Sequence, residues 1–167
     1  PQVAVSIAYA ENGEIQTGVV HCPFLGETFH AINGESATLN HKRIQVSSIN
    51  QLNQALIGTG FPYDKSTTDE LTTRLNKVIK SCRDIRRNGS AAIDICWVAC
   101  GRLDGFYESL SPWDFAAARL IATQAGAVAG HFSEQEGSML AALNGKDILI
   151  GNPHIYDDLK AILVKAY

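Results

Sequence analysis

The chain has 167 residues, of which 46% are apolar and 19% are charged, and its formal net charge is −3. A chain of this length and composition can bury its own core, which excludes an intrinsically disordered protein. No basic stretch indicates nucleic-acid binding, and no apolar run approaches the roughly 20 residues that cross a bilayer. The first residues also lack the basic start and cleavage signature of a secretory leader. We therefore expect a cytoplasmic protein that binds neither nucleic acid nor membrane.

The first 46 residues alternate strand-like runs with turn dipeptides. Strands are predicted at residues 3–10, 14–22 and 26–32. The first run ends at Asn12-Gly13 and the third at Asn33-Gly34, and such dipeptides favour tight turns. Strands joined by short turns pair antiparallel. Residues 1–46 are therefore expected to form an antiparallel meander, the remainder of an N-terminal sheet.

From residue 47 onward, predicted strands and helices alternate. Strands are predicted at residues 55–61, 84–86, 105–108, 127–132 and 148–152. Helices are predicted at residues 67–82 and 90–100, from Pro112 to a terminator at Gly126, and at residues 156–167. This alternation is typical of layered α/β folds, so residues 47–167 are expected to form a C-terminal α/β domain.

Asp114 stands between two aromatic residues at the expected start of a helix. Proline is tolerated in a first helical turn, as at Pro112, and an acid there faces the unpaired N–H groups of the helix end. The residues alone leave two interpretations open. Asp114 either caps the helix or serves a function in addition.

The residues around Asp114 resemble the C-terminal signature of the inositol monophosphatase family, the magnesium-dependent, lithium-sensitive phosphatases. The segment RRNGSAAIDICWVACGRLDGFYESLSPWDFAAARLIATQAGA contains the family's motifs in the family's order. These are an arginine, a Gly-Ser-Ala-Ala turn, a Val-Ala-x-Gly helix end, a strand that ends in glutamate, and a Trp-Asp pair. The first residues also resemble the family's strand meander and the hairpin after it, whose frame is kept by Gly34, Ala37 and Asn40. The resemblance covers essentially the whole chain.

The resemblance implies a fold and a metal ligand. The fold is a layered α-β-α-β-α sandwich of the sugar phosphatase type, with its front part absent. Asp114 is implied to bind Mg²⁺, which agrees with the preference of this hard cation for carboxylate oxygens. Trp113 is expected to pack behind Asp114 in a structural role.

The resemblance also implies how a substrate is bound. Gly89, Ser90 and Ala91 match the family turn whose backbone N–H groups and small side chains meet the substrate hydroxyls. A helix start made of small residues leaves its N–H donors accessible to a polyol phosphate. Glu108 matches the glutamate that accepts hydrogen bonds from the inositol ring. Without the resemblance, Ser90 would be interpreted as an ordinary helix cap and Glu108 as a solvated acid.

The rest of the family's metal site is missing from this sequence. The family uses a glutamate pair and an Asp-Pro-x-Asp-Gly-Thr motif, which the resemblance places before Pro1, and neither occurs among the 167 residues. Each Mg²⁺ usually needs one or two protein carboxylates besides phosphate. We therefore assign no catalytic residue to this chain and expect it to be inactive alone.

Two functions stay open. In the first, the chain is the C-terminal part of a Mg²⁺-dependent hydrolase of inositol phosphate or a similar polyol phosphate, with a metal-activated water attacking phosphorus in line. Its N-terminal half is then on another chain, was lost or precedes Pro1, and the resemblance implies a homodimer. In the second, the chain is a truncated, non-catalytic relative that acts as a binding or assembly partner. The first is favoured because Asp114, Glu108 and the turn at Gly89 are retained together.

Overall fold

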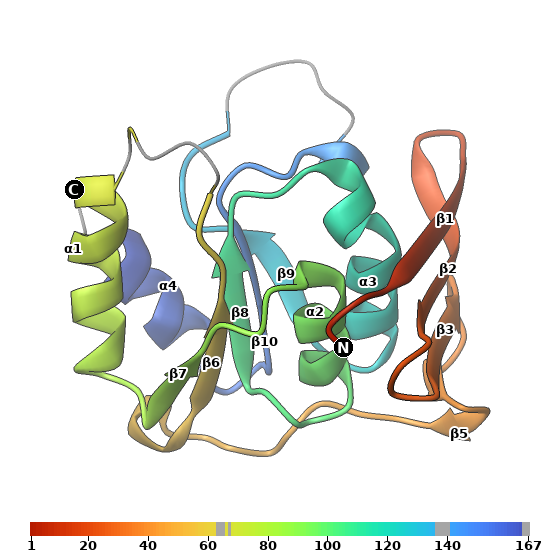
Figure 1. Cartoon of the computed structure of the whole chain (residues 1–167), viewed down its shortest axis with the longest axis horizontal. Coiled ribbons are helices and arrows are strands. Elements are labelled where there is room, and N and C mark those ends of the chain that lie inside the picture. Colours follow the sequence, from red (N-terminus) through yellow and green to blue (C-terminus); the bar gives the residue numbers. More distant parts are fainter. Residues whose placement is uncertain (63–65, 67, 136–140, 165–167) are drawn as a thin grey trace.

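The computed structural model describes residues 1–62, 66, 68–135 and 141–164, and these form two sheets and the helices that cover them. Figure 1 shows the layers in order: helices α1 (Thr68–Ile79) and α4 (Tyr156–Val164), one sheet, helices α2 (Ala91–Ala99) and α3 (Pro112–Gln124), and the other sheet. Short 3₁₀ helices lie at Leu52–Gln54 and Ala141–Leu143. The predicted layered α/β fold is confirmed. None of the helices in the described ranges is long and apolar enough to span a membrane.

The first sheet is the predicted meander. Its five strands follow chain order: β1 (Val5–Glu11), β2 (Glu14–Cys22), β3 (Glu27–Ile32), β4 (Thr38–Leu39) and β5 (Lys42–Arg43). All neighbours pair antiparallel. Asn12 and Gly13 take φ angles of 52° and 84° in the β1–β2 turn, the conformation that a two-residue hairpin needs.

Strands β4 and β5 form a hairpin where the resemblance placed one, although each strand has only two residues. Their turn contains Asn40 at φ 48°. The Asn40 side chain accepts a hydrogen bond from the Thr28 N–H at 2.8 Å and donates one to the Gly26 carbonyl at 2.9 Å. These bonds tie the hairpin to the start of β3 and give Asn40 a structural role.

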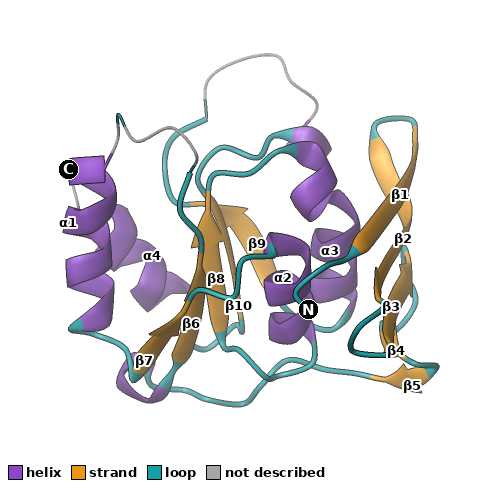
Figure 2. Ribbon diagram, in the orientation of Figure 1, coloured by secondary structure: helices purple, strands orange, loops and turns teal. Residues whose placement is uncertain are grey.

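The second sheet contains the five strands predicted after residue 46, and Figure 2 shows it between the helices. Its order is β7 (Asp84–Arg86), β6 (Leu56–Thr59), β8 (Gly105–Glu108), β10 (Ile148–Gly151) and β9 (Val128–His131). Strand β6 runs parallel to β7 and β8, whereas β10 runs antiparallel to β8 and β9. Because β6 and β8 are parallel, Thr59 and Glu108 end up at the same edge of the sheet.

The predicted helices agree with the structure within a few residues. Helices α2 and α3 lie between the sheets, and α2 is buried along most of its length, as expected for a helix with apolar residues on all sides. A Cβ atom at Gly18 in β2 would lie 2.7 Å from the Ala117 carbonyl oxygen, so this glycine lets α3 approach the first sheet closely. Residues 67 and 165–167 of the predicted helices lie outside the described residues.

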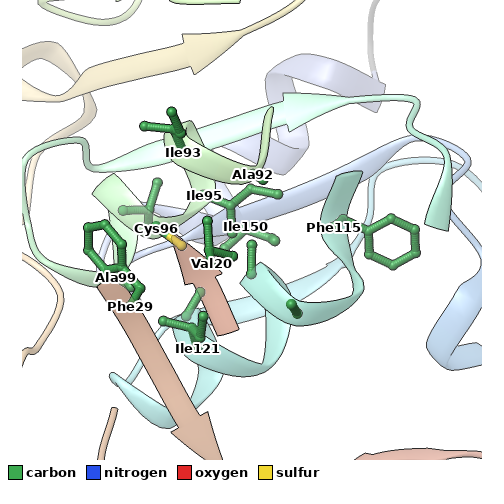
Figure 3. Packing of buried hydrophobic residues seen from close by; sticks show 14 of the residues in the cluster. Val20, Phe29, Ala92, Ile93, Ile95, Cys96, Ala99, Phe115, Ile121 and Ile150 are labelled. Atoms are coloured by element: carbon green, nitrogen blue, oxygen red, sulfur yellow. The ribbon is translucent and has the colours of Figure 1, made fainter. Parts of the chain in front are cut away.

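Two hydrophobic clusters hold the layers together. Figure 3 shows the larger one, in which Val20 and Phe29 of the first sheet contact α2 and α3 beside Ile150 of the second sheet. The smaller one joins the second sheet to α1 and α4. The segments 1–46 and 47–167 therefore contribute to one core, and their division into two domains stays a prediction.

Candidate functional site

The site residues expected from the sequence lie around one pocket of about 120 Å³. The pocket lies where β6 and β8 end and where α2 and α3 begin. Gly89, Ser90, Ala91, Glu108 and Asp114 all line it. Segments far apart in the sequence are thus brought to one place by the fold. The sequence alone missed six further lining residues: Thr59, Gly60, Phe61, Arg87, Asp94 and Leu110.

The turn before α2 is built to leave its polar groups accessible. Gly89 has a φ angle of 97°, which a residue with a side chain adopts only with strain. Ser90 occupies the N-cap position with extended backbone, yet its hydroxyl makes no cap hydrogen bond within the described structure. An ordinary cap therefore does not explain this serine. The N–H groups at the start of α2 and the helix dipole favour an anion here.

Asp94 supports this turn from inside α2. Its side chain is buried, and the Asn88 Nδ2 donates a hydrogen bond to Asp94 Oδ1 at 2.6 Å. Burial raises the pKa of Asp94 to about 6, although the Asn88 hydrogen bond and the positive charge of Arg87 lower it. Asp94 thus fixes the residue that precedes Gly89. The signal in the sequence was an acid within the apolar run IDICWVA, because a buried carboxylate needs a partner.

Glu108 is the last residue of β8, the central strand of the second sheet, and it is partly buried. Burial raises the pKa of Glu108 to about 7, the charge of Arg87 lowers it, and the charges of Asp114 and Asp94 raise it further. A Cβ atom at Gly60 would collide with the Glu108 carboxylate. Glycine at this position therefore makes room for the acid.

Asp114 is the third residue of α3, at the mouth of the pocket. Its Oδ2 accepts a hydrogen bond from the Ser111 N–H at 3.3 Å, so the carboxylate caps the helix and also lines the pocket. The expectation that Trp113 packs behind Asp114 is wrong, because the Trp113 side chain is 72% exposed. Phe115, on the opposite side of the first turn, takes the buried position instead.

The pocket combines negative side chains with positive helix ends. The starts of α2 and α3 and the guanidinium of Arg87 favour anions, whereas Asp94, Glu108 and Asp114 favour cations. Arg87 lies over the Phe61 ring, with 5.7 Å from its Cζ to the ring centroid. Such a mixture suits a ligand that carries an anionic group together with a cation.

The carboxylates fit the donor preference of Mg²⁺ but do not complete a site for it. Mg²⁺ prefers carboxylate oxygens, which this pocket offers. Within the ranges that the structure describes, no group of three His, Cys, Asp or Glu side chains is placed to hold a metal ion. The chain's own residues therefore supply at most part of a metal site.

Comparisons with known proteins identify the family of the chain. The model of the inositol monophosphatase family matches residues 1–166. Nus factor SuhB from Escherichia coli is 39% identical over 167 residues, and putative Nus factor SuhB from Neisseria meningitidis is 38% identical over 165 residues. Each match covers 98% of this chain but only 59% and 62% of those proteins, so the chain spans about three-fifths of the length of these curated relatives.

Solved structures share the fold. Inositol monophosphatase from Anabaena (Nostoc) sp. PCC 7120 matches with a TM-score of 0.87 and 35% identity, over 97% of this chain and 64% of that one. SuhB from Mycobacterium tuberculosis matches with a TM-score of 0.85 and 34% identity, over 98% of this chain and 64% of that one. The chain therefore belongs to the inositol monophosphatase family.

Proposed function

We propose that this chain is the substrate-binding part of a Mg²⁺-dependent phosphate monoesterase that acts on inositol phosphate or a similar polyol phosphate. The observation that carries the proposal is the convergence of Glu108, Asp114 and the turn at Gly89 on one pocket. Family membership supports a phosphatase of this type. A homodimer and a cytoplasmic location belong to the same proposal and rest on the resemblance and the composition.

In this proposal the start of α2 binds hydroxyl groups of the substrate. The backbone N–H groups after Gly89 donate to hydroxyl oxygens of the polyol, and the small side chains of the turn let the polyol phosphate come close. Asp94 and Asn88 hold the turn in place through their 2.6 Å hydrogen bond. Glu108, at the end of β8, accepts a hydrogen bond from a hydroxyl of the alcohol.

Asp114 supplies a metal ligand in this proposal. Its position at the start of α3 restricts the carboxylate, which favours a defined geometry. Mg²⁺, when bound, neutralises charge on the phosphoryl oxygens and acidifies a water molecule. The family ligands that the resemblance places before Pro1 are needed to complete that site, so the chain alone is expected to be inactive.

Binding of inositol 1-phosphate tests the proposal without requiring turnover. We expect the ligand, in the presence of Mg²⁺, to shift the amide NMR signals of Gly89, Ser90 and Ala91. Glu108→Gln is expected to weaken binding about tenfold, because a hydrogen bond to a charged acceptor contributes about 1.5–3 kcal/mol. Glu134→Gln is the control, because Glu134 lines none of the described pockets.

Two results would contradict parts of the proposal separately. No shift at the turn, or equal weakening by both glutamine variants, would contradict the substrate site. Mg²⁺-dependent hydrolysis of inositol 1-phosphate by the purified 167 residues would leave that site intact and contradict only the incomplete metal site.

A binding or assembly role without catalysis is the second candidate. One observation favours it: Val5, Ile7 and Tyr9 on the same face of β1 are 52%, 61% and 57% exposed. Such an apolar row fits a protein partner. Binding of inositol 1-phosphate distinguishes the two roles, because a purely structural relative does not bind this ligand at the turn before α2.

A further inference from the structure

A second pocket, of about 380 Å³, lies between α1 and the second sheet. Its volume is within the range of small-molecule sites. The wall that it shares with the candidate site consists of Thr59, Gly60, Phe61 and Glu108. The turn at Gly89 is not part of its lining. The second pocket is therefore large enough to hold a ligand of its own beside the place of the polyol.

Asp147 places a buried carboxylate in the wall of this pocket. The residue is only 7% exposed. Its Oδ1 accepts a hydrogen bond from Ser109 Oγ at 2.9 Å, and its N–H donates to the same hydroxyl oxygen at 3.0 Å. Within the described ranges, Asp147 Oδ2 accepts no hydrogen bond, and it is not sealed off from the pocket. A buried carboxylate needs partners for both oxygens, so this oxygen is suited to a donor on a ligand.

Aromatic side chains form an apolar surface in the same pocket. Tyr107 and Phe132 meet edge to face, with ring centroids 6.3 Å apart and an interplanar angle of 79°. Both side chains are buried, and the Arg74 guanidinium lies over the Phe132 ring, with 4.7 Å from Cζ to the centroid. Leu71 of α1 adds an aliphatic side chain to the lining. These contacts restrain the rings, and a preformed surface of this kind favours a flat apolar group.

The charges of the lining favour a cation over an anion. The charged residues that line the pocket are Glu70, Arg74, Glu108, Lys146 and Asp147. Acids outnumber bases among them, and the Arg74 guanidinium already contacts Phe132. Lys146 is exposed, so solvent screens its charge, whereas the buried carboxylate of Asp147 is screened much less. A positive group is therefore favoured next to Asp147.

We propose that the second pocket is a binding site for a flat aromatic amine. The ring lies against Tyr107, Phe132 and Leu71, and the ammonium group donates a hydrogen bond to Asp147 Oδ2. Such a bond is charge-assisted and shielded from solvent, which makes it stronger than a neutral one. The site is separate from the place of the polyol at the turn before α2, so the inference does not depend on the proposed function.

Three ligands that differ in one feature each test the proposal by calorimetry. 2-Naphthylmethylamine carries the ring and the charge, 2-naphthylmethanol the ring alone, and methylamine the charge alone. We expect the naphthyl amine to bind about tenfold more tightly than the naphthyl alcohol, because only the amine forms a charge-assisted hydrogen bond. Methylamine is expected to show no measurable binding, because it buries almost no apolar surface. Intermolecular NOEs from the naphthyl protons to the Leu71 methyl groups are expected.

A matched pair of variants locates the charge effect. Asp147→Asn keeps an acceptor for Ser109 and suits the φ angle of 50° at this position, which asparagine tolerates as aspartate does. It is expected to reduce the affinity for the naphthyl amine to that for the alcohol, with the affinity for the alcohol unchanged. Asp158→Asn removes the same charge at an exposed position of α4 that lines none of the described pockets, and is expected to keep the preference.

The outcomes are decisive in both directions. Equal affinity of the wild type for the naphthyl amine and alcohol, or a preference that survives in Asp147→Asn, overturns the site. An equal loss in Asp158→Asn also overturns it, because the preference then reflects the overall charge of the chain. If Asp147→Asn does not fold, the amine-to-alcohol ratio and the NOEs of the wild type decide. No phosphate ester or metal is present, so the result leaves the proposed function untouched.

Discussion

The two sheets differ in how they are covered. Successive residues of β10 in the second sheet face opposite sides: Leu149 lies in the cluster with α1 and α4, and Ile150 in the cluster with α2 and α3. Both are fully buried. In the first sheet, Val20 faces α3 and is buried, whereas Ile7 on the outer face of β1 is 61% exposed. Within the described residues, helices cover the second sheet on both faces and the first on one.

This difference places the candidate site on the better supported part of the molecule. Glu108 ends a strand of the doubly covered sheet, and Asp114 begins a helix that lies between the sheets. Side chains that must hold a ligand are positioned best on rigid elements. The first sheet contributes to the site only indirectly, through its contacts with α3.

The largest effect is expected where the second sheet meets α2 and α3. Ile150→Ala removes buried methyl groups and leaves a cavity that neighbours on both sides cannot fill easily. We expect the free energy of unfolding to fall by about 2–5 kcal/mol. Urea denaturation of the wild type and of Ile150→Ala measures this difference. A decrease in the free energy of unfolding as small as that expected for an exposed residue would contradict the description of β10 as covered on both faces.

Asp114→Asn is expected to affect function rather than folding. The amide oxygen of asparagine can still accept the hydrogen bond from the Ser111 N–H, so the thermal midpoint without metal is expected to change little. If Asp114 binds Mg²⁺, metal-dependent hydrolysis by a protein that contains the complete site falls about 100-fold, because the negative charge is lost. Rates against Mg²⁺ concentration measure this, and a near-normal rate would show that Asp114 only caps α3.

The buried position of Asp94 gives a pH-dependent prediction. Its pKa is raised from 3.8 to about 6, so the folded state holds this proton more tightly than the unfolded state does. This contribution to stability is present below about pH 4 and is lost as the pH rises to about 6. Asp94→Asn keeps an acceptor for Asn88 and removes the titration.

We expect the stability of Asp94→Asn relative to wild type to increase across that interval by about 1–3 kcal/mol. Denaturation at a series of pH values measures the difference. A constant difference, or one that decreases with pH, would contradict burial as the cause of the raised pKa.

Local signals predicted much of the fold. The dipeptide Asn12-Gly13 indicated the first hairpin, and alternating apolar runs indicated the second sheet. The hairpin of β4 and β5 was predictable only through the resemblance, because strands of two residues have no periodicity of their own. Trp113 was placed wrongly, because its exposure depends on tertiary packing that the helix start does not determine.

The candidate site was predictable mainly through the resemblance. Asp114 and Glu108 are close in sequence, but nothing local brings them to the turn at Gly89. Asp94 was missed because it lies in an apolar helical run, where the pattern indicates core rather than site. Gly60 was missed because its role depends on the position of the Glu108 carboxylate, which is set by the pairing of β6 and β8.

The smallest effect is expected on the exposed face of the first sheet. Ile7→Ala removes the same atoms as Ile150→Ala, but the Ile7 side chain is 61% exposed, so little buried area is lost. We expect the free energy of unfolding to fall by less than about 1 kcal/mol, the span of strand propensities. Urea denaturation at several protein concentrations measures both the loss and its origin. A loss comparable to that of Ile150→Ala, with a midpoint that rises with protein concentration, would show that a second copy covers this face in solution, since only association makes stability depend on concentration.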